Sequence, residues 1–578
     1  MASPSSNRGA DSNTMWPPGT VRLENTSAPA GQDLILQPRP SEDPNDPLNW
    51  PQWRKFLNIG LVCFYVAMVA EFINAATPTW GPMNQQLGFS YEVLNDSYAA
   101  GCASLAIGSL LLIPFALKFG RRPLYLSSTI LQFALSIWSA KMQTVADLML
   151  INILQCFFGS LAEVIVQMTI ADVFFVHERG RMNALYVWVW LLSSYLGSLI
   201  AGFVAKGQGW RWVWWLNSIF FGVSIFIVGF GYEETKFCPS SPSSTSDLPP
   251  EADVDTDSKS TPPRNINDAT CDFEKKSTDM TKTWSSQGVA DLASIPANEE
   301  ATTYNITPVT INPDIPRKTY WERLAITTTT SSSNQKNDSF LRHMYQPLIL
   351  LTTIPAIAYA ALVYGILVGL GDVMSTTLST YLTQPPYNFT SDQIGLMSLP
   401  RMIGVTIGAL IIGPMSDWWI IYLSRRRNGI YDPEMRLWCI IPFLLFVPTG
   451  ALLFGIGLNN HLPWPIIAVG LALYNIGVTP INSLVITYLT DSYKEIIGDA
   501  LVGVTVVRNT FSTAFIFALS PWVAAIGIKY VLVTILLIAC GILMLFGVFI
   551  RYGKTFRERS ASRYQYYALR QYNEKGFH

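Results

Sequence analysis

Long apolar stretches alternate with short polar segments along most of the chain. Each stretch holds about twenty residues, enough for a helix to cross a bilayer with a hydrocarbon core of about 30 Å. The pattern therefore predicts an all-α membrane protein with about twelve transmembrane helices, six on each side of a long polar segment. The predicted spans are residues 56–76, 98–117, 124–142, 147–171, 184–204, 213–232, 346–371, 394–413, 437–457, 464–488, 500–524 and 530–550.

The polar segment at 234–345 is dominated by Ser, Thr, Pro, Asp and Asn. Such a composition cannot bury enough apolar surface to offset the entropy lost on ordering, so we expect a disordered central cytoplasmic loop. A short helix near Trp321 to Leu324 is expected within it. The predicted organisation is a disordered N-terminus (1–55), an N-terminal six-helix bundle (56–233), the linker (234–345), a C-terminal six-helix bundle (346–552) and a cytoplasmic tail (553–578).

Two apolar segments about three hundred residues apart have nearly the same sequence. Residues 106–118 and 406–418 share the order Ile, Gly, Leu, Pro at matching positions, and each segment is followed by basic residues. A duplicated membrane half is typical of secondary transporters, whose substrate binds near the midplane between the halves. The alternative is chance similarity between two apolar helices. The matching residues are Ile107, Gly108, Leu110 and Pro114 in the first copy and Ile407, Gly408, Leu410 and Pro414 in the second.

Composition excludes several classes of function. Of the 578 residues only 14% are charged, and the mean hydropathy is +0.27. The net charge of −1 argues against nucleic acid as a partner. None of the seven cysteines forms a C-x-x-C pair, so we expect neither a disulfide framework nor a zinc site. We expect no cofactor and no other metal. The first fifty residues are polar and proline-rich, and no signal peptide is expected there.

Basic residues are concentrated in alternate loops. They cluster in the loops that lie inside if the N-terminus is cytoplasmic, which predicts that both termini are cytoplasmic. Two glycosylation sequons, at Asn95 and Asn388, then fall in loops on the outer side. We expect these two asparagines to be accessible to glycosylation.

The fourth span carries a stripe of polar side chains at helical spacing. Because these residues lie three or four positions apart, they share one helical face, which should line a cavity or another helix rather than lipid. Glu163 is the first candidate for proton coupling, since a carboxyl group in a closed cavity can take up and release a proton. The alternative is a structural ion pair with an arginine. The other members of the stripe are Asn152, Gln155, Gly159 and Gln167, of which Asn152, Gln155 and Gln167 are candidate substrate ligands.

Other ionisable residues inside predicted spans need a reason, because burying a charge in the bilayer is costly. Glu71 in span one is the second proton-coupling candidate, with Asn74 beside it as a substrate ligand; a carboxylate at the outer rim is the alternative. Asp372 closes span seven and is interpreted as a rim residue. Arg401 and Arg508 could bind an anionic group of a substrate or neutralise an acid, and the latter role is favoured. Aromatic residues such as Tyr364 could line a cavity for flat or cationic molecules, although most pack against lipid or other helices.

The loop Phe119-Gly-Arg-Arg-Pro123 after span two resembles the signature loop of the major facilitator superfamily. Leu117 replaces the Asp of that signature, and Ile113 replaces its first Gly. The second half keeps another part of the pattern, as Gly413-Pro-Met-Ser-Asp417. The resemblance implies that these loops help to latch the two halves together on the cytoplasmic side. The candidate latch residues are Gly120, Arg121, Arg122, Gly413 and Asp417.

Three further stretches are similar to fungal members of the drug:proton antiporter branch, including relatives of histidinol, polyamine and organic-cation permeases. They lie at 46–51, 172–180 and 209–217. The branch usually has an Arg in span four where this chain has Asn152, and its span-five glycine pattern survives only as Gly197 to Gly202. The resemblance implies two pseudo-symmetric bundles that rock about a central cavity. It also implies a fungal source and the plasma membrane, with the vacuolar membrane as the alternative.

The sequence therefore predicts a proton-coupled secondary transporter that exports a small organic compound such as a drug, toxin or secondary metabolite. Proton-coupled uptake of organic cations such as polyamines or histidinol is the alternative, and a non-transporting nutrient sensor is a third possibility. The expected partners are the substrate, protons and the lipid bilayer, and we expect a monomer. An ATP-driven pump is not expected, because Val548 stands where a P-loop before Gly553-Lys-Thr555 needs Gly. Four scattered histidines offer no enzyme-like cluster.

Overall fold

The computed structural model describes residues 17–22, 43–174, 176–236, 316–324, 340–427 and 430–574. Most of this part of the chain is helical, and eleven helical segments in it are long and apolar enough to cross a membrane. The α-helices are α1 (Gln52–Asn74), α2 (Trp80–Leu87), α3 (Tyr91–Phe119), α4 (Arg122–Ala140), α5 (Val145–Gly159), α6 (Leu161–Val173), α7 (Val176–Gly207), α8 (Trp210–Gly231), α10 (Tyr320–Arg323), α11 (Phe340–Thr353), α12 (Pro355–Leu382), α13 (Ser391–Leu396), α14 (Ser398–Arg426), α15 (Phe446–Asn459), α16 (Trp464–Ser492), α17 (Ile497–Ile526), α18 (Ile528–Met544) and α19 (Phe546–Glu574).

Short 3₁₀ helices and one small sheet complete the described structure. Strand β1 pairs antiparallel with β2, so that Val21 lies opposite Tyr431 and Arg22 opposite Ile430. The 3₁₀ helices and strands are η1 (Pro47–Asn49), η2 (Thr77–Thr79), η3 (Pro433–Phe443), η4 (Lys494–Ile496), β1 (Val21–Arg22) and β2 (Ile430–Tyr431).

Helix α4 is the twelfth span, although it is less apolar than the others. Its 19 residues reach about 28 Å at 1.5 Å per residue. Most of its polar side chains are buried, and some bond to neighbouring helices: Gln132 donates to the Gln155 carbonyl at 2.8 Å, and the Ser136 and Ser218 hydroxyls are 2.8 Å apart. Such bonds hold membrane helices together. The structure thus contains eleven strongly apolar spans, and we assign α4 as the twelfth.

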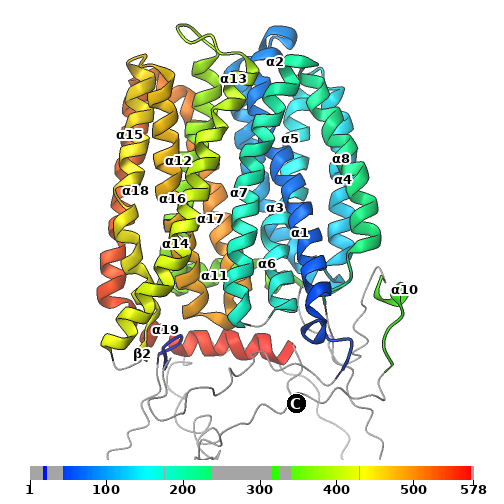
Figure 1. Cartoon of the computed structure of the whole chain (residues 1–578), viewed down its shortest axis with the longest axis vertical. Coiled ribbons are helices and arrows are strands. Elements are labelled where there is room, and N and C mark those ends of the chain that lie inside the picture. The colour runs from blue at the N-terminus through cyan, green and yellow to red at the C-terminus, as the bar shows by residue number, and fades with distance from the viewer. Residues whose placement is uncertain are drawn as a thin grey trace, which may run out of the picture. The chain divides into compact units, whose positions relative to one another are not determined.

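The buried apolar side chains form two main cores, one in each half of the chain. One is built from residues between Ile59 and Tyr232, and the other from residues between Leu350 and Ala568. In Figure 1 the helices of the first half (α1, α3, α4 and α8) lie to one side and those of the second (α12, α14, α16 and α18) to the other. Smaller clusters join the halves where α3 and α6 contact α17, such as Ile113 with Val164 and Val502. The two-bundle architecture is therefore confirmed.

The duplicated segments occupy equivalent places in the two halves. Gly108 of α3 lies so close to span four that an added Cβ would be 2.5 Å from the Phe157 carbonyl oxygen. Gly408 of α14 lies against α16, where an added Cβ would be 3.0 Å from Pro480 Cδ. Each repeat thus uses its glycine to bring the second helix of a bundle against the fourth. This equivalence favours duplication over chance similarity.

Span seven begins later than the sequence suggested. The predicted span 346–371 crosses a break, because α11 ends at Thr353 and α12 runs from Pro355 to Leu382. The break lies at Ile354, which has extended φ and ψ of −115° and 106°. A residue before proline disfavours the helical conformation, which explains the break. The span is therefore displaced toward the C-terminus, and the predicted bounds were wrong.

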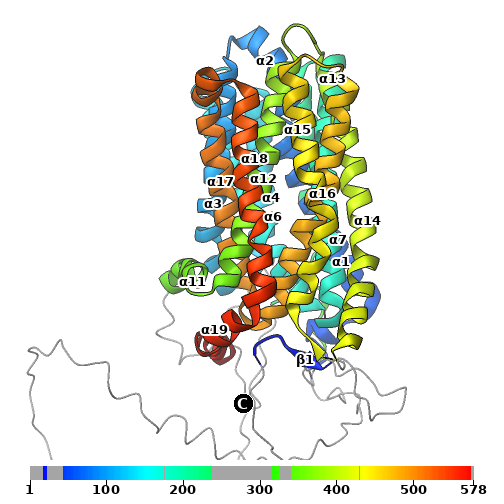
Figure 2. The ribbon, with the colours of Figure 1, turned by 90° about the vertical axis from the view of Figure 1, so that its left-hand side faces the viewer.

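Helix α11 and the C-terminal part of α19 lie across the same end of the other helices (Figures 1 and 2). This end also carries the strand pair, and we call it the α19 end. The opposite end, which carries α2 and α13, is called the α13 end. The predicted linker 234–345 lies mostly outside the described residues; those that are described include α10 and the start of α11 at Phe340.

An N-terminal segment, residues 17–22, is attached to the C-terminal half at the α19 end. Arg557 is fully buried and donates to both carboxylate oxygens of Glu434 at 2.8 and 2.7 Å. The same guanidinium donates to the Thr20 hydroxyl at 3.0 Å, and Thr20 in turn donates to Asp432. A bidentate arginine–carboxylate pair is both strong and geometrically specific. The segment is thus held by one buried arginine as well as by the β1–β2 pairing.

We expect Arg557→Leu to lower the free energy of unfolding by about 3–5 kcal/mol, because it leaves the buried Glu434 carboxylate without its partner. Thermal unfolding of the detergent-solubilised protein measures this change. Arg563→Leu is the matched control on the same helix, since the contact its guanidinium makes with the described residues is an exposed one of 3.5 Å to the Thr353 carbonyl. Equal unfolding temperatures for the two variants would contradict the importance of the Arg557 contacts.

Candidate functional site

A buried ion pair joins the two halves of the protein near the middle of the bundle. The Arg508 guanidinium of α17 donates to Glu163 Oε1 of α6. The two side chains are only 10% and 3% exposed. Asn509 adds a longer contact of 3.5 Å to Glu163 Oε2, and its own amide oxygen accepts from Arg508 at 2.9 Å. The stripe residue Glu163 thus faces the other half of the protein.

The local structure of span four sets the position of Glu163. The helix is interrupted at Ser160, where α5 ends and α6 begins. Beyond this interruption Tyr186 of α7 donates its hydroxyl to the carbonyls of Ala162 and Glu163, both at 3.2 Å. These bonds to α7 fix the first turn of α6. The Glu163 carboxylate therefore projects from a backbone that is hydrogen-bonded to α7.

Asp372 lies inside the bundle and not at its rim. It is in the middle of α12, and its Oδ2 accepts a hydrogen bond of 2.6 Å from the Ser512 hydroxyl of α17. It also interacts electrostatically with Arg508 and Arg401. The interpretation of Asp372 as a rim residue was wrong, because the break at Ile354 moves α12 along the chain. Asp372 as a whole residue is half-buried.

Arg401 of α14 is the second buried arginine of this region. Its guanidinium donates to the Ser375 hydroxyl at 2.7 Å and lies 5.6 Å from the ring centre of Tyr195. Within the described residues it forms no ion pair, and its second terminal nitrogen has no hydrogen-bond partner there. Tyr195 donates to the Asn475 side chain at 2.9 Å, which adds a contact between α7 and α16.

Glu163, Asp372, Arg401 and Arg508 together form what we call the central charge cluster. Two carboxylates and two guanidinium groups give the cluster a formal charge of zero. Aromatic rings surround it, including that of Tyr364, whose centre is 5.7 Å from the Arg508 guanidinium. Carboxylates beside aromatic faces can bind an organic cation, and the guanidinium groups can bind an anionic group. The described residues contain no group of three or more His, Cys, Asp or Glu side chains that could hold a metal ion.

Glu71 lies inside the N-terminal bundle, away from the central charge cluster. It is buried and accepts a hydrogen bond of 3.3 Å from Asn217 of α8. Helix α7 packs closely against it, since a Cβ at Gly197 would be 2.5 Å from Glu71 Cγ. Its Oε2 has no hydrogen-bond partner in the described part of the chain. The structure places Glu71 in the bundle interior, so the rim alternative was wrong.

The remaining candidate ligands lie in different surroundings. Asn152 and Gln155 line a small cavity of about 20 Å³ inside the N-terminal bundle, beside Tyr98 and Trp214. A cavity of this size holds about one water molecule, not an organic substrate. Asn74 donates to the Ala70 carbonyl of its own helix. These side chains are not brought together with the central charge cluster; Tyr364 is, through Arg508.

The loop after span two is held within the N-terminal bundle. Gly120 has a φ of 106°, and a Cβ there would be 2.5 Å from the Glu234 carboxylate. That carboxylate accepts from the backbone N–H groups of Arg121 and Arg122, each at 3.0 Å. Arg121 also forms an ion pair of 3.2 Å with Asp172. The described contacts of this loop therefore join spans two, four and six of one half, and the latch between halves remains a prediction.

The structure also shows where the remaining latch and glycosylation candidates lie. Gly413 is exposed within α14, and the side chain of Asp417 lies outside the described residues. Asn388 lies in an exposed loop at the α13 end, with a φ of 48°. The placement of Asn95 in a loop was wrong: it lies in α3 and is only 5% exposed. A glycan on this buried asparagine would not fit into the folded bundle, so Asn388 is the candidate that remains of the two.

The two halves also contact each other at the α13 end. A Cβ added at Gly202 of α7 would be 2.5 Å from the Ser391 carbonyl oxygen and 3.0 Å from Gly395 Cα. Nearby, the Lys206 ammonium forms an ion pair of 2.8 Å with Asp392. Close backbone approach at small residues is typical of helix pairs in membranes. These contacts hold the C-terminal end of α7 against α13.

We expect Gly202→Leu to separate the halves at the α13 end, because the added side chain has no room against α13. Pulsed electron resonance between spin labels at Gln208 and Gln384, both exposed, measures the separation. A longer mean distance than in the parent is expected. Gly207→Leu is the matched control, since an added Cβ there meets nothing within 4 Å. Identical distance distributions for both variants and the parent would contradict this role for Gly202.

Sequence reasoning missed several residues of the site. Ser512 lies four positions after Arg508 and three after Asn509, so its side chain shares a helical face with each of them, and these polar residues in an otherwise apolar span were a usable signal. Ser375 and Asn475 gave a weaker signal, because single polar residues in a membrane helix often bond only to their own backbone.

Comparison with known proteins agrees with this architecture. Residues 59–515 match the Major Facilitator Superfamily. An uncharacterized MFS-type transporter of Schizosaccharomyces pombe is 30% identical over 92% of this chain and 89% of its own length. Protein HOL1 of Saccharomyces cerevisiae is 30% identical over 93% of this chain and 92% of its own length. The MFS antiporter QDR3 of Candida albicans is 24% identical over 89% of this chain and 80% of its own length.

The fold also resembles that of solved transporters. The MFS proton:xylose symporter XylE superposes with a TM-score of 0.52 at 12% identity, covering 87% of this chain and 96% of that chain. At this identity the likeness concerns the fold alone. Two six-helix halves, the family match over most of the chain and the similar fungal transporters lead to one conclusion. The chain belongs to the major facilitator superfamily and is a multi-pass membrane transporter.

Proposed function

We propose that the protein is a proton-coupled antiporter that exports a small organic compound with a cationic group by alternating access. The observation that carries the proposal is the central charge cluster, in which Glu163 of one half is paired with Arg508 of the other. Protonation of Glu163 would remove the ionic part of this pair. A proton bound at this position therefore weakens a contact that holds the two halves in one arrangement.

The charge of the cluster favours exchange over co-transport of a cation. With its two acids and two bases ionised, the cluster is neutral, and either a proton or a cationic substrate makes its charge +1. Binding both would make it +2 in a site with little water, where like charges repel strongly. A proton and a cation therefore exclude each other. We assign the Asp372 carboxylate to the substrate cation and the Glu163 carboxylate to the proton.

Export and location are also part of this proposal. The similar fungal protein QDR3 is named an MFS antiporter, which supports exchange. We place the α19 end in the cytoplasm and the protein in the plasma membrane, in agreement with the distribution of basic loop residues.

Uptake of organic cations is the second candidate, and the same observation supports it. A carboxylate beside aromatic rings recognises a cation whichever way the transporter runs. Direction then depends on the gradients and on which side the substrate is supplied. The chemical class of the substrate and the direction of transport are therefore separate questions.

Both the chemical class of the substrate and the direction of transport can be measured with the protein reconstituted in liposomes that contain a pH dye. Organic amines and their uncharged isosteres are added to one side, and proton movement is recorded. We expect cations to drive protons in the opposite direction and uncharged isosteres to drive none. Protons that move with the cation would contradict antiport, and equal responses to both classes would contradict recognition of a cation by Asp372.

A further inference from the structure

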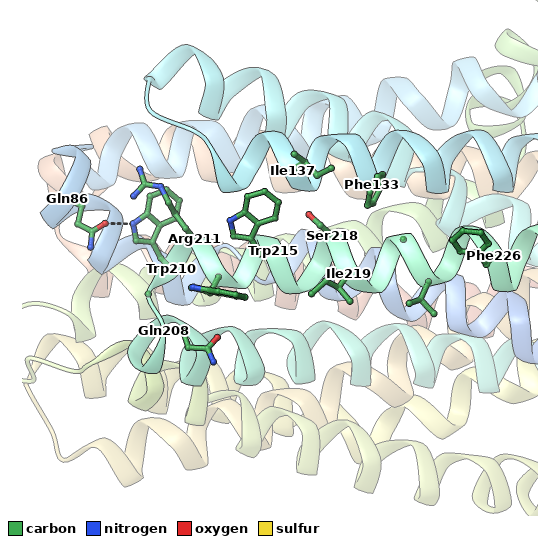
Figure 3. Close-up of a pocket in the computed structure, with 14 residues that line it drawn as sticks. Gln86, Phe133, Ile137, Gln208, Trp210, Arg211, Trp215, Ser218, Ile219 and Phe226 are labelled. Atoms are coloured by element: carbon green, nitrogen blue, oxygen red, sulfur yellow. Dashed lines mark hydrogen bonds between the residues drawn. The ribbon is translucent and has the colours of Figure 1, made fainter.

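A large surface groove lies apart from the central charge cluster, since none of the four cluster residues lines it. It is a groove of about 980 Å³ on the outside of the N-terminal bundle, between α4 and α8. In Figure 3, Phe133 and Ile137 of α4 lie on one side of it and Trp215 and Ile219 of α8 on the other. Several lining side chains are open to the surroundings, such as Trp212 at 50% and Phe226 at 67% exposed. In a membrane this face contacts lipid.

The groove has a floor of small residues. Ser218 and Gly222 lie one helical turn apart on α8, and the Ser218 hydroxyl is turned inward to Ser136 at 2.8 Å. A Cβ at Gly222 would only just touch Phe133, at 3.4 Å. Aromatic and branched side chains of α4 and α8 line both sides of the groove next to these small residues. The result is an elongated apolar channel that runs along the helix, a shape suited to a single acyl chain.

One end of the groove is polar and positively charged. Arg211 stacks over the Trp210 ring at 4.4 Å and reaches the Met142 carbonyl at 3.5 Å. Trp210 itself is fixed by a hydrogen bond of 2.7 Å to Gln86 of α2 (Figure 3). Arg211 forms no ion pair with any residue that the structure describes. Its guanidinium is therefore positioned at the mouth of the groove with capacity for an anionic group.

The depth of the groove in the membrane follows from its tryptophans. Trp210, Trp212 and Trp215 gather at the α13 end, and tryptophan is enriched at the membrane–water boundary. Arg211 then lies at the level of lipid headgroups, while Ile219 to Phe226 lie at the level of acyl chains. The groove thus matches a molecule with an anionic head and an apolar tail.

We infer that this groove is a binding site for one glycerophospholipid from the leaflet at the α13 end. The phosphodiester accepts hydrogen bonds from Arg211, whose planar fork suits phosphate. One acyl chain lies over Ser218 and Gly222 between the two helices. A sterol fits less well, because its single hydroxyl carries no charge to neutralise Arg211. This site is independent of the central charge cluster and does not require a particular substrate.

Native mass spectrometry of the full-length protein tests this inference. The delipidated protein is incubated in mild detergent with chain-deuterated phosphatidylcholine, or in a separate arm with cholesterol, and the bound adduct is quantified. We expect one tightly retained phosphatidylcholine per protein. Arg211→Gln and Gly222→Leu should each reduce the retained fraction at least tenfold, the first by removing the phosphate partner and the second by filling the channel.

Two control variants show whether the loss is specific. Lys529→Gln removes another base near the same end, and Gly541→Leu adds a side chain at an exposed glycine of α18 that meets nothing within 4 Å. Both should retain the lipid like the parent. Thermal unfolding confirms that all four variants are folded. Retention by the groove variants equal to that of the controls, or retention of cholesterol in place of phosphatidylcholine, would overturn the inference.

Discussion

Replacing Arg508 with methionine is expected to lower the free energy of unfolding by about 3–5 kcal/mol, the usual cost of removing one partner of a buried ion pair. The Glu163 carboxylate would be left in the interior with only the 3.5 Å contact from Asn509. Because the pair joins α6 to α17, the variant should also lose contact between the two halves. Transport driven by a pH gradient should fall by at least tenfold.

The double variant Glu163→Gln with Arg508→Met separates charge from packing. It removes both charges, so no uncompensated carboxylate remains, and most of the lost stability should return. Proton coupling should not return, since no titratable group is left at position 163. Arg401→Met is a useful control, because Arg401 forms no ion pair among the described residues. This substitution should therefore lower the free energy of unfolding by less than Arg508→Met does. If the double variant were as unstable as Arg508→Met, the ion pair would not be the source of the effect.

Asp372→Asn is expected to raise the KM for a cationic substrate by about 10- to 100-fold, which corresponds to one charge-assisted hydrogen bond of about 1.5–3 kcal/mol. The amide has nearly the same shape, and its oxygen can still accept from Ser512, so the unfolding temperature should change little. The measurement is the initial rate of exchange at varied substrate concentration in liposomes.

The same experiment distinguishes substrate binding from a general structural role. Asp392→Asn removes a carboxylate that pairs with Lys206 at the α13 end and should leave KM for the cation nearly unchanged. An Asp372→Asn variant with unchanged KM and normal stability would contradict the assignment of Asp372 as the cation-binding group. Parallel losses of stability and maximal rate, without a change in KM, would indicate a structural role.

Much of the fold could be predicted from the pattern of apolar residues, because each span must be long enough to cross the bilayer. The repeat around Gly108 and Gly408 could be recognised in the sequence for a similar reason. In each half, two helices pack so closely that the contact position requires glycine. The residues at which helices begin and end were harder to predict from the sequence. Ser90 caps α3 by accepting from the Val93 N–H, and this signal was available to place Asn95 inside the helix.

The pairing of charges could not be read from the sequence. Glu163 and Arg508 are 345 positions apart, and no local pattern indicates which of the buried arginines lies opposite which acid. Glu163 was identified correctly as a buried acid on a polar face, while its partner depended on how α6 meets α17. Asp372 was misplaced because a single proline shifted its helix along the membrane.

We propose above all that protonation of Glu163 couples proton movement to the rocking of the two halves. The most direct test compares native protein with Glu163→Gln in liposomes, following substrate and proton flux with and without an imposed pH gradient. We predict that the gradient accelerates substrate movement through the native protein and has no effect on the variant, which still moves substrate down its own gradient. A variant that remains coupled to protons as strongly as the native protein would contradict the account.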